Sequence, residues 1–283
     1  MSAPLPDLLI TQLLDTPTVR IRDVRCEGAN RHKSASERVT RTQLVYPYWG
    51  VYVRHVGVDD AVAEPSQVLY FNAGESYCVS HPVAGGDSSF VVEPEDSVLR
   101  ELAPKERLLD GEPLRFRIQN SRLDTRAQAL AALLRHSLKT GVIEQLEAES
   151  LALTLIQRTL GRRTSREATG SPGHRKLVDR TKLVLSADLS RRWTLGDIAS
   201  EVGVSPVYLT QVFQRVEGVP LYRFQLRLRL AQALELLGRE ADLTRIALDL
   251  GFSNHSHFSS AFRQAYGRSP SAFKDIVLAK QDR

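Results

Sequence analysis

The chain is poor in cysteine, with only Cys26 and Cys78 among 283 residues. Two cysteines cannot make the framework of disulfides that holds small secreted domains together. No run of 18 apolar residues is present, so no segment has the composition of a transmembrane helix. The N-terminus lacks the basic and apolar regions of a signal peptide. We therefore expect a cytoplasmic protein without a membrane-bound part.

Clusters of metal-ligating residues are also missing. His81 is followed by Pro82 and has no second histidine two residues away, and His255 and His257 lie two apart in a predicted helix, where they do not face each other. We predict no catalytic residues, no metal site and no cofactor. Cys26, Cys78 and His81 are interpreted mainly as core residues, with a soft metal site or an oxidant-sensing pair of thiols as the open alternative. The Gly85-Gly86-Asp87 turn is interpreted as structural.

Near its C-terminus the chain repeats itself once, at an offset of 48 to 49 residues. The pattern Leu-x-x-Ile-Ala-x-x-x-Gly-x-Ser starts at Leu195 and again at Leu243, and Phe213 returns as Phe262. The apolar residues fall at i, i+3, i+4 and i+7, which is one face of a helix. Each copy therefore begins with a short amphipathic helix.

A glycine ends each of these helices because it tolerates the left-handed conformation of a tight stop. The serine two positions later, Ser205 or Ser253, is suited to cap a second helix. Two apolar residues four positions apart then face inward in each second helix: Leu209 and Phe213, and Phe258 and Phe262. The two copies predict helix-turn-helix units at residues 195–216 and 243–266.

The segment between the two copies, Tyr222 to Leu237, contains neither Gly nor Pro. It is rich in good helix formers, and a helix of about 16 residues spans roughly 24 Å. Such a rod can present both second helices to one face of DNA, where major-groove openings recur about every 34 Å.

These residues resemble the AraC/XylS family of transcription regulators, over roughly residues 177–276. Three stretches carry the resemblance: Arg229-Leu-x-x-Ala-x-x-Leu-Leu, Ile246-Ala-x-x-x-Gly-Phe, and Phe262-Arg followed by Gly267-Arg-Ser-Pro-Ser-Ala-Phe-Lys. The resemblance implies a two-lobed DNA-binding domain on a regulator that responds to a ligand, most often an activator that works with RNA polymerase. The charge agrees, since residues 174–283 hold 17 Lys and Arg against 11 Asp and Glu, and the rest of the chain has a net charge of −1.

Residues on the second helices that do not face inward are candidates for contact with double-stranded promoter DNA. We predict ten: Val207, Thr210, Gln211, Gln214, Arg215, His255, Ser256, Ser259, Ser260 and Arg263. Gln211 can form a bidentate contact with adenine, and Val207 or the Thr210 methyl can meet a thymine methyl. The small hydroxyls of the second unit favour phosphate or water-mediated contacts.

The remaining sequence predicts an α+β protein of two domains. Residues 1–120 resemble the cupin-like sensor domains of the same family, with strands expected at 51–56, 67–71, 76–80 and 89–92 in a barrel or sandwich, and a loop at Asp59, Asp60 and Pro65. Residues 121–160 predict two helices broken at Gly141, a helical extension that either packs on its own domain or pairs two chains as a homodimer. Residues 161–173 are the expected linker, and residues 174–283 the DNA-binding domain.

The sequence thus predicts a DNA-binding transcription regulator with an unidentified small-molecule effector acting through the N-terminal domain. Activation is the commoner role in the family and is expected here by analogy alone. Two alternatives stay open. One is a metal-binding cupin-type enzyme or sensor with a fused helical domain. The other is an interaction module that has lost DNA binding.

Overall fold

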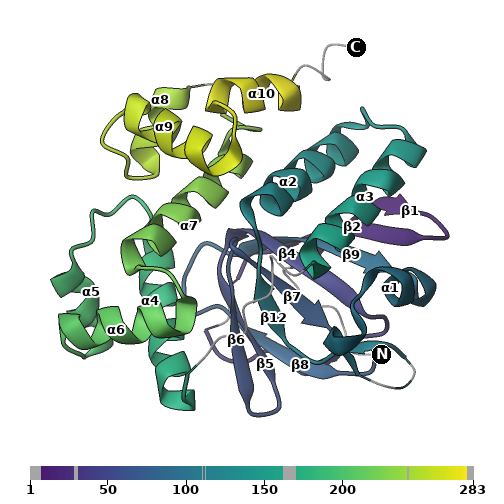
Figure 1. Ribbon diagram of the computed structural model, residues 1–283, viewed down its shortest axis with the longest axis horizontal. Helices are drawn as coiled ribbons and strands as arrows, with labels where there is room; N and C mark the ends of the chain where they lie inside the picture. The colour runs from purple at the N-terminus through teal and green to yellow at the C-terminus, as the bar shows by residue number, and fades with distance from the viewer. Residues whose placement is uncertain are drawn as a thin grey trace. The chain divides into compact units, whose positions relative to one another are not determined.

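The computed structural model describes residues 8–28, 31–109, 111, 113–161, 170–240 and 242–278. The chain divides into two compact units (Figure 1), one of residues 1–166 with 274–283 and one of residues 167–273. The first is rich in strands and the second is helical. This confirms the predicted α+β class, while the finer domain boundaries given above stay predictions.

Two antiparallel sheets dominate the first unit. The larger has the order β1 (Leu8–Asp15), β2 (Val19–Cys26), β9 (Asp87–Pro94), β4 (Gln43–Gly50), β7 (Gln67–Phe71) and β12 (Asn120–Arg122). The smaller has the order β3 (Glu37–Arg38), β8 (Ser76–Ser80), β5 (Tyr52–Val56) and β6 (Asp59–Ala63). A short pair, β10 (Leu108–Leu109) and β11 (Arg115–Phe116), lies apart from both. The ladders of the described strands do not join the two sheets, so the β-rich domain is confirmed and a closed barrel is not.

The four expected strands correspond to β5, β7, β8 and β9. The expected loop at Asp59, Asp60 and Pro65 is wrong for the two aspartates, because they begin β6 and pair with Val56 and His55, whereas Pro65 does lie in a turn between β6 and β7. The turn lies at Gly57, whose φ is +56°. The sequence misled because acidic residues favour turns, whereas here they occupy the exposed end of a hairpin strand.

Helices α1 (Asp96–Leu102), α2 (Thr125–Thr140) and α3 (Gln145–Leu160) complete the first unit, with a 3-10 turn at Lys105–Arg107. Gly141 ends α2 in the left-handed conformation at φ 68°, as the sequence predicts. The apolar faces of α2 and α3 are buried in the same core as the larger sheet, so their stripe is covered within its own unit. Pairing of two chains through this region stays a prediction.

The second unit is built from helices α4 (Pro172–Ala187), α5 (Leu195–Val202), α6 (Pro206–Glu217), α7 (Leu221–Leu236), α8 (Leu243–Asp249) and α9 (His255–Tyr266), and α10 (Pro270–Leu278) begins in it. Helix α4 starts inside the stretch expected as a linker, because Ser171 caps it and Pro172 takes the first turn. Residues 162–169 of that stretch lie outside the described residues. No helix in the described ranges is long and apolar enough to cross a membrane.

Candidate nucleic-acid interface

The first helix-turn-helix consists of α5 and α6. Thr194 and Asp197 form a capping box at the start of α5, each side chain accepting a backbone N–H of the other. Gly203 ends the helix at φ 73°, and Ser205 begins the next by accepting the N–H of Tyr208 at 3.2 Å. Sequence and structure therefore agree on both ends of the turn.

The second helix-turn-helix consists of α8 and α9. Asp242 caps α8 by accepting the N–H of Thr244 at 2.8 Å, and Gly251 has a φ of +74°. The expectation that Ser253 caps α9 is wrong. Asn254 is the cap and accepts the N–H of His257 at 2.8 Å, while the Ser253 hydroxyl lies 3.3 Å from Nδ1 of His257. The cap thus moves by one residue, which accounts for the offset of 49 in the second half of the repeat.

Aromatic packing orients both second helices. Leu209 and Phe213 of α6 are fully buried, and the Phe213 ring meets Phe224 of α7 edge-on at 5.3 Å. Phe258 and Phe262 of α9 are also fully buried, with ring centroids 5.7 Å apart. With these faces fixed inward, the opposite face of each helix is directed to solvent.

The ten predicted contact residues lie on those outward faces. Thr210 and Ser259 are half-buried, and the other eight are exposed: Val207, Gln211, Gln214, Arg215, His255, Ser256, Ser260 and Arg263. Val207 is an apolar residue that is 68% exposed. The Thr210 hydroxyl donates to the carbonyl oxygen of Pro206 at 2.9 Å. The hydroxyl proton is therefore used in a hydrogen bond within the helix.

Two features of this surface escaped the sequence reasoning. Tyr208 is 45% exposed beside Val207, and its ring meets His174 of α4 edge-on at 6.3 Å. On α9 the Ser259 hydroxyl lies 3.2 Å from Nε2 of His255. The sequence signal that could have identified Tyr208 is its spacing of three residues from Gln211, which places both on one face of the helix.

Arg229 of α7 connects the two helix-turn-helix units. Its guanidinium donates to the carbonyl oxygens of Leu189 at 2.8 Å and Arg191 at 2.9 Å, both in the loop before α5. It also donates to the carbonyl oxygen of Gly251, in the turn of the second unit, at 3.1 Å. Burial and the nearby charge of Arg192 lower the pKa of Arg229. One side chain therefore satisfies backbone acceptors of both units.

A buried ion pair connects α6 to α4. Nζ of Lys182 in α4 lies 2.6 Å from a carboxylate oxygen of Glu217, the last residue of α6, and both side chains are buried. The Lys182 ammonium also lies 5.6 Å from the centre of the Phe224 ring. The pair joins α4 to the C-terminal end of α6.

Comparison with known proteins places this architecture in a class. Residues 198–276 match the family described as "Helix-turn-helix domain", so the second unit is a helix-turn-helix domain. It is of the AraC/XylS type, as the sequence predicts.

The chain is similar to several curated regulators. It is 29% identical to the regulatory protein PocR of Salmonella typhimurium, over 48% of this chain and 46% of PocR. It is 27% identical to the transcriptional activator RhaR of Cronobacter sakazakii, over 62% of each chain. A transcriptional regulator from Chromobacterium violaceum with an AraC-type DNA-binding domain is 28% identical, with 38% of this chain and 96% of that chain covered and a TM-score of 0.36. The chain spans about half the length of the curated relatives it matches.

Proposed function

We propose that the protein is a sequence-specific DNA-binding transcription regulator whose second unit binds promoter DNA through α6 and α9. The observation that carries the proposal is the pair of capped helices, each fixed by a buried aromatic face and each with its opposite face exposed. This is the arrangement in which a helix-turn-helix inserts its second helix into the major groove. The exposed faces of the two helices suit a DNA-binding protein rather than an enzyme. We place the protein in the cytoplasm, where such a regulator can contact the chromosome.

The two helices differ in what they offer to DNA. On α6, Gln211 has the amide that pairs with adenine, and Val207 and the Thr210 methyl fit thymine methyl groups. Because the Thr210 hydroxyl donates to Pro206, its methyl group and oxygen lone pairs are what it can present. On α9, His255, Ser256, Ser259 and Ser260 offer small polar groups suited to phosphates and water-mediated contacts. We therefore propose that α6 supplies most of the base discrimination.

The remaining basic residues on these faces are assigned to phosphate contact. Arg215 lies in the last turn of α6, and Arg263 lies in the last turn of α9. Gln214, which directly precedes Arg215, is assigned to the same role. Contacts of this kind fix the register of a protein on DNA without reading its sequence. They also make affinity fall as salt rises, because binding releases counterions.

The N-terminal unit is assigned to sensing. RhaR is named a transcriptional activator, and we propose activation through RNA polymerase here, with a small-molecule effector bound by the first unit and a homodimer as the assembled form. An effector of this kind must bind the active and inactive states of the regulator unequally.

Sequencing of genomic fragments retained by the purified protein at two salt concentrations tests the proposal. We expect enrichment of one bipartite sequence with half-sites about one helical turn, 10–10.5 base pairs, apart. The genes beside the enriched sites then identify the regulon. Uniform retention that disappears with salt, with no preferred sequence, contradicts the proposal and favours an interaction module.

A further inference from the structure

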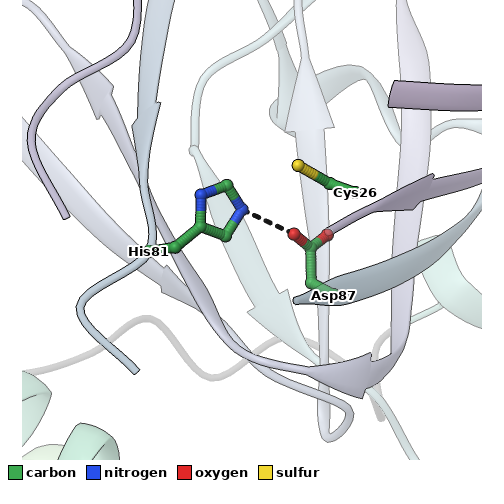
Figure 2. Close-up of side chains that lie close together, drawn as sticks. All are labelled: Cys26, His81 and Asp87. Carbon is green, nitrogen blue, oxygen red and sulfur yellow. Dashed lines mark hydrogen bonds and ion pairs between the residues drawn. The ribbon is translucent and has the colours of Figure 1, made fainter. Parts of the chain in front are cut away.

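Three chemically different ligand groups meet at one corner of the N-terminal unit. Cys26 ends β2, His81 follows β8, and Asp87 begins β9. Cys26 and Asp87 are directly opposite in the β2–β9 ladder, so their side chains leave the same face of the sheet. His81 approaches them from the end of the neighbouring sheet (Figure 2).

The three side chains converge on a single point. One ligand atom from each, the Cys26 sulfur, a His81 ring nitrogen and an Asp87 carboxylate oxygen, lies within 4.8 Å of the other two. Nε2 of His81 is 2.7 Å from Oδ2 of Asp87. His81 and Asp87 are buried and Cys26 is half-buried. The group is therefore shielded from most of the solvent, while the Cys26 side remains partly accessible to it.

The ring orientation separates a metal site from a catalytic triad. In a triad the two ring nitrogens serve different partners, one the nucleophile and the other the carboxylate. Figure 2 shows that Nε2 of His81 faces both Asp87 and Cys26, while Nδ1 points away. A thiol, an imidazole nitrogen and a carboxylate directed at one point are instead a ligand set that zinc accepts.

The backbone around the group is closely packed. Gly28, Gly50 and Gly86 each have a φ of +68°. A methyl group at position 86 would lie 2.3 Å from the carbonyl oxygen of Cys26, and one at position 28 would lie 3.2 Å from Cδ2 of His81. Three segments distant in sequence therefore hold the ligand-bearing residues at fixed positions, as a preorganised site requires.

We propose that Cys26, His81 and Asp87 bind one divalent transition-metal ion, with Zn²⁺ the ion that this ligand set fits. Zinc takes sulfur at about 2.3 Å and nitrogen or oxygen at about 2.0–2.2 Å, so the ligand atoms of a tetrahedral site lie about 3.3–3.8 Å apart. Binding of the ion therefore requires the 2.7 Å contact between His81 and Asp87 to widen and any wider separation among the three atoms, all within 4.8 Å of one another, to close. Three protein ligands leave a fourth coordination position for water or a small anionic ligand.

An ion that binds this group displaces protons from its ligands, as metal binding to histidine and cysteine generally does. The proposal is independent of DNA binding, and neither result decides the other.

Cys78 provides a matched control. The sequence alternative grouped it with Cys26 and His81, but Cys78 lies within β8 opposite His55 and outside the three-residue group. Both cysteines are free and half-buried. Loss of one thiol can therefore be compared with loss of the other in the same unit.

Titration of the full-length protein with Zn²⁺ against a chromophoric chelator, and with Co²⁺ followed by absorption, tests the site. We expect one equivalent of ion and a thiolate-to-cobalt charge-transfer band. Cys26→Ala and His81→Ala weaken binding more than about 100-fold, beyond the 10–100-fold typical of residues that only support ligands. Cys78→Ala leaves the affinity and the band unchanged.

A second measurement needs no variant. Zn²⁺ should slow alkylation of Cys26 in the wild-type protein, read by mass spectrometry of the peptides, and leave alkylation of Cys78 unaffected. Absence of metal binding by the folded wild type, equal protection of both thiols, or unchanged affinity in Cys26→Ala each overturns the proposal. Oxidation of Cys26 by peroxide in a protein that binds no ion assigns the group to a reactive thiol instead.

Discussion

The guanidinium of Arg229 packs closely against the backbone of Gly251. Nη1 of Arg229 donates to the carbonyl oxygen of Gly251 at 3.1 Å, and a methyl group at position 251 would lie 2.6 Å from Nη2 of the same guanidinium. The turn of the second helix-turn-helix therefore needs glycine for two reasons, its φ of +74° and the approach of the arginine.

Gly251→Ala is expected to destabilise the second unit more than Gly267→Ala does. Gly267 has nearly the same φ, +75°, but no atom lies within 4 Å of the position that a methyl group would take. Its replacement costs only the left-handed conformation, about 1–2 kcal/mol, whereas Gly251→Ala adds about 1–3 kcal/mol of overpacking. Urea unfolding followed by Trp193 fluorescence in a Trp49→Phe background measures both. A methyl group at position 251 would also lie 2.5 Å from the carbonyl oxygen of Ser190. Equal losses would show that the contacts with Arg229 and Ser190 relax without cost.

Arg229→Ala is expected to lower the free energy of unfolding by about 2–4 kcal/mol, since three hydrogen bonds from a charged donor are lost and the carbonyl oxygens regain water only in part. Arg223→Ala on the same helix is the control, because Arg223 is exposed. Arg229→Ala should also weaken binding to a two-half-site DNA more than binding to one half-site. An equal effect on both DNAs would contradict the role of Arg229 in connecting the units.

The Lys182–Glu217 pair predicts a non-additive double variant. Lys182→Met alone leaves a buried carboxylate and costs about 3–5 kcal/mol, whereas Lys182→Met with Glu217→Leu removes both charges and recovers most of that loss. The same Trp193 readout in urea applies. A double variant as unstable as the sum of the single ones would mean that the two charges do not stabilise each other.

Gln211→Ala is expected to weaken binding to the enriched sequence by about 1–3 kcal/mol and to leave binding to random DNA nearly unchanged. Gln157→Ala is the matched control, because Gln157 is an exposed glutamine on α3 in the first unit. Fluorescence anisotropy of the wild type and both variants with both DNAs at one salt concentration gives the six affinities. Equal losses on specific and random DNA would exclude Gln211 from base reading.

Asp23 predicts a pH-dependent contribution to the first unit. Burial raises the pKa of its carboxyl group, but hydrogen bonds from Tyr48 and Lys139 and the charges of Lys139 and Arg135 outweigh burial, and the pKa lies below its ordinary value. The stabilisation is therefore complete above about pH 4 and is lost as the pH falls through the folded-state pKa. The stability difference between wild type and Asp23→Asn, measured by Trp49 fluorescence in a Trp193→Phe background, should shrink in acid. A difference constant down to about pH 2 would contradict this.

The helical unit was largely predictable because its signals are local. Apolar residues at helical spacing, a glycine at Gly203 and Gly251, and capping residues before α6 and α9 all lie within a few positions of what they determine. The choice of Asn254 over Ser253 was not predictable, since both residue types cap helices.

The group of Cys26, His81 and Asp87 could not be predicted in the same way. Its formation depends on the register of β2 against β9, a pairing between segments about 60 residues apart. In the sequence Asp87 is only the last residue of a glycine turn, and Cys78 is as good a candidate as Cys26. Sequence periodicity reports which face of a strand a residue occupies, but not which strand lies opposite.

The rigid connection through α7 has a consequence for how such regulators change over generations. In the proposed complex with DNA, a rod held by Arg229 fixes both the distance and the rotational phase between two half-sites, so five base pairs inserted between them move the second half-site to the far side of the duplex, about half a turn away. Under the same proposal, spacing is inherited with the scaffold, whereas base preference depends on a few exposed side chains of α6. Descendants of a protein that binds DNA in this way can acquire new promoters by single substitutions, provided that those promoters keep the ancestral spacing.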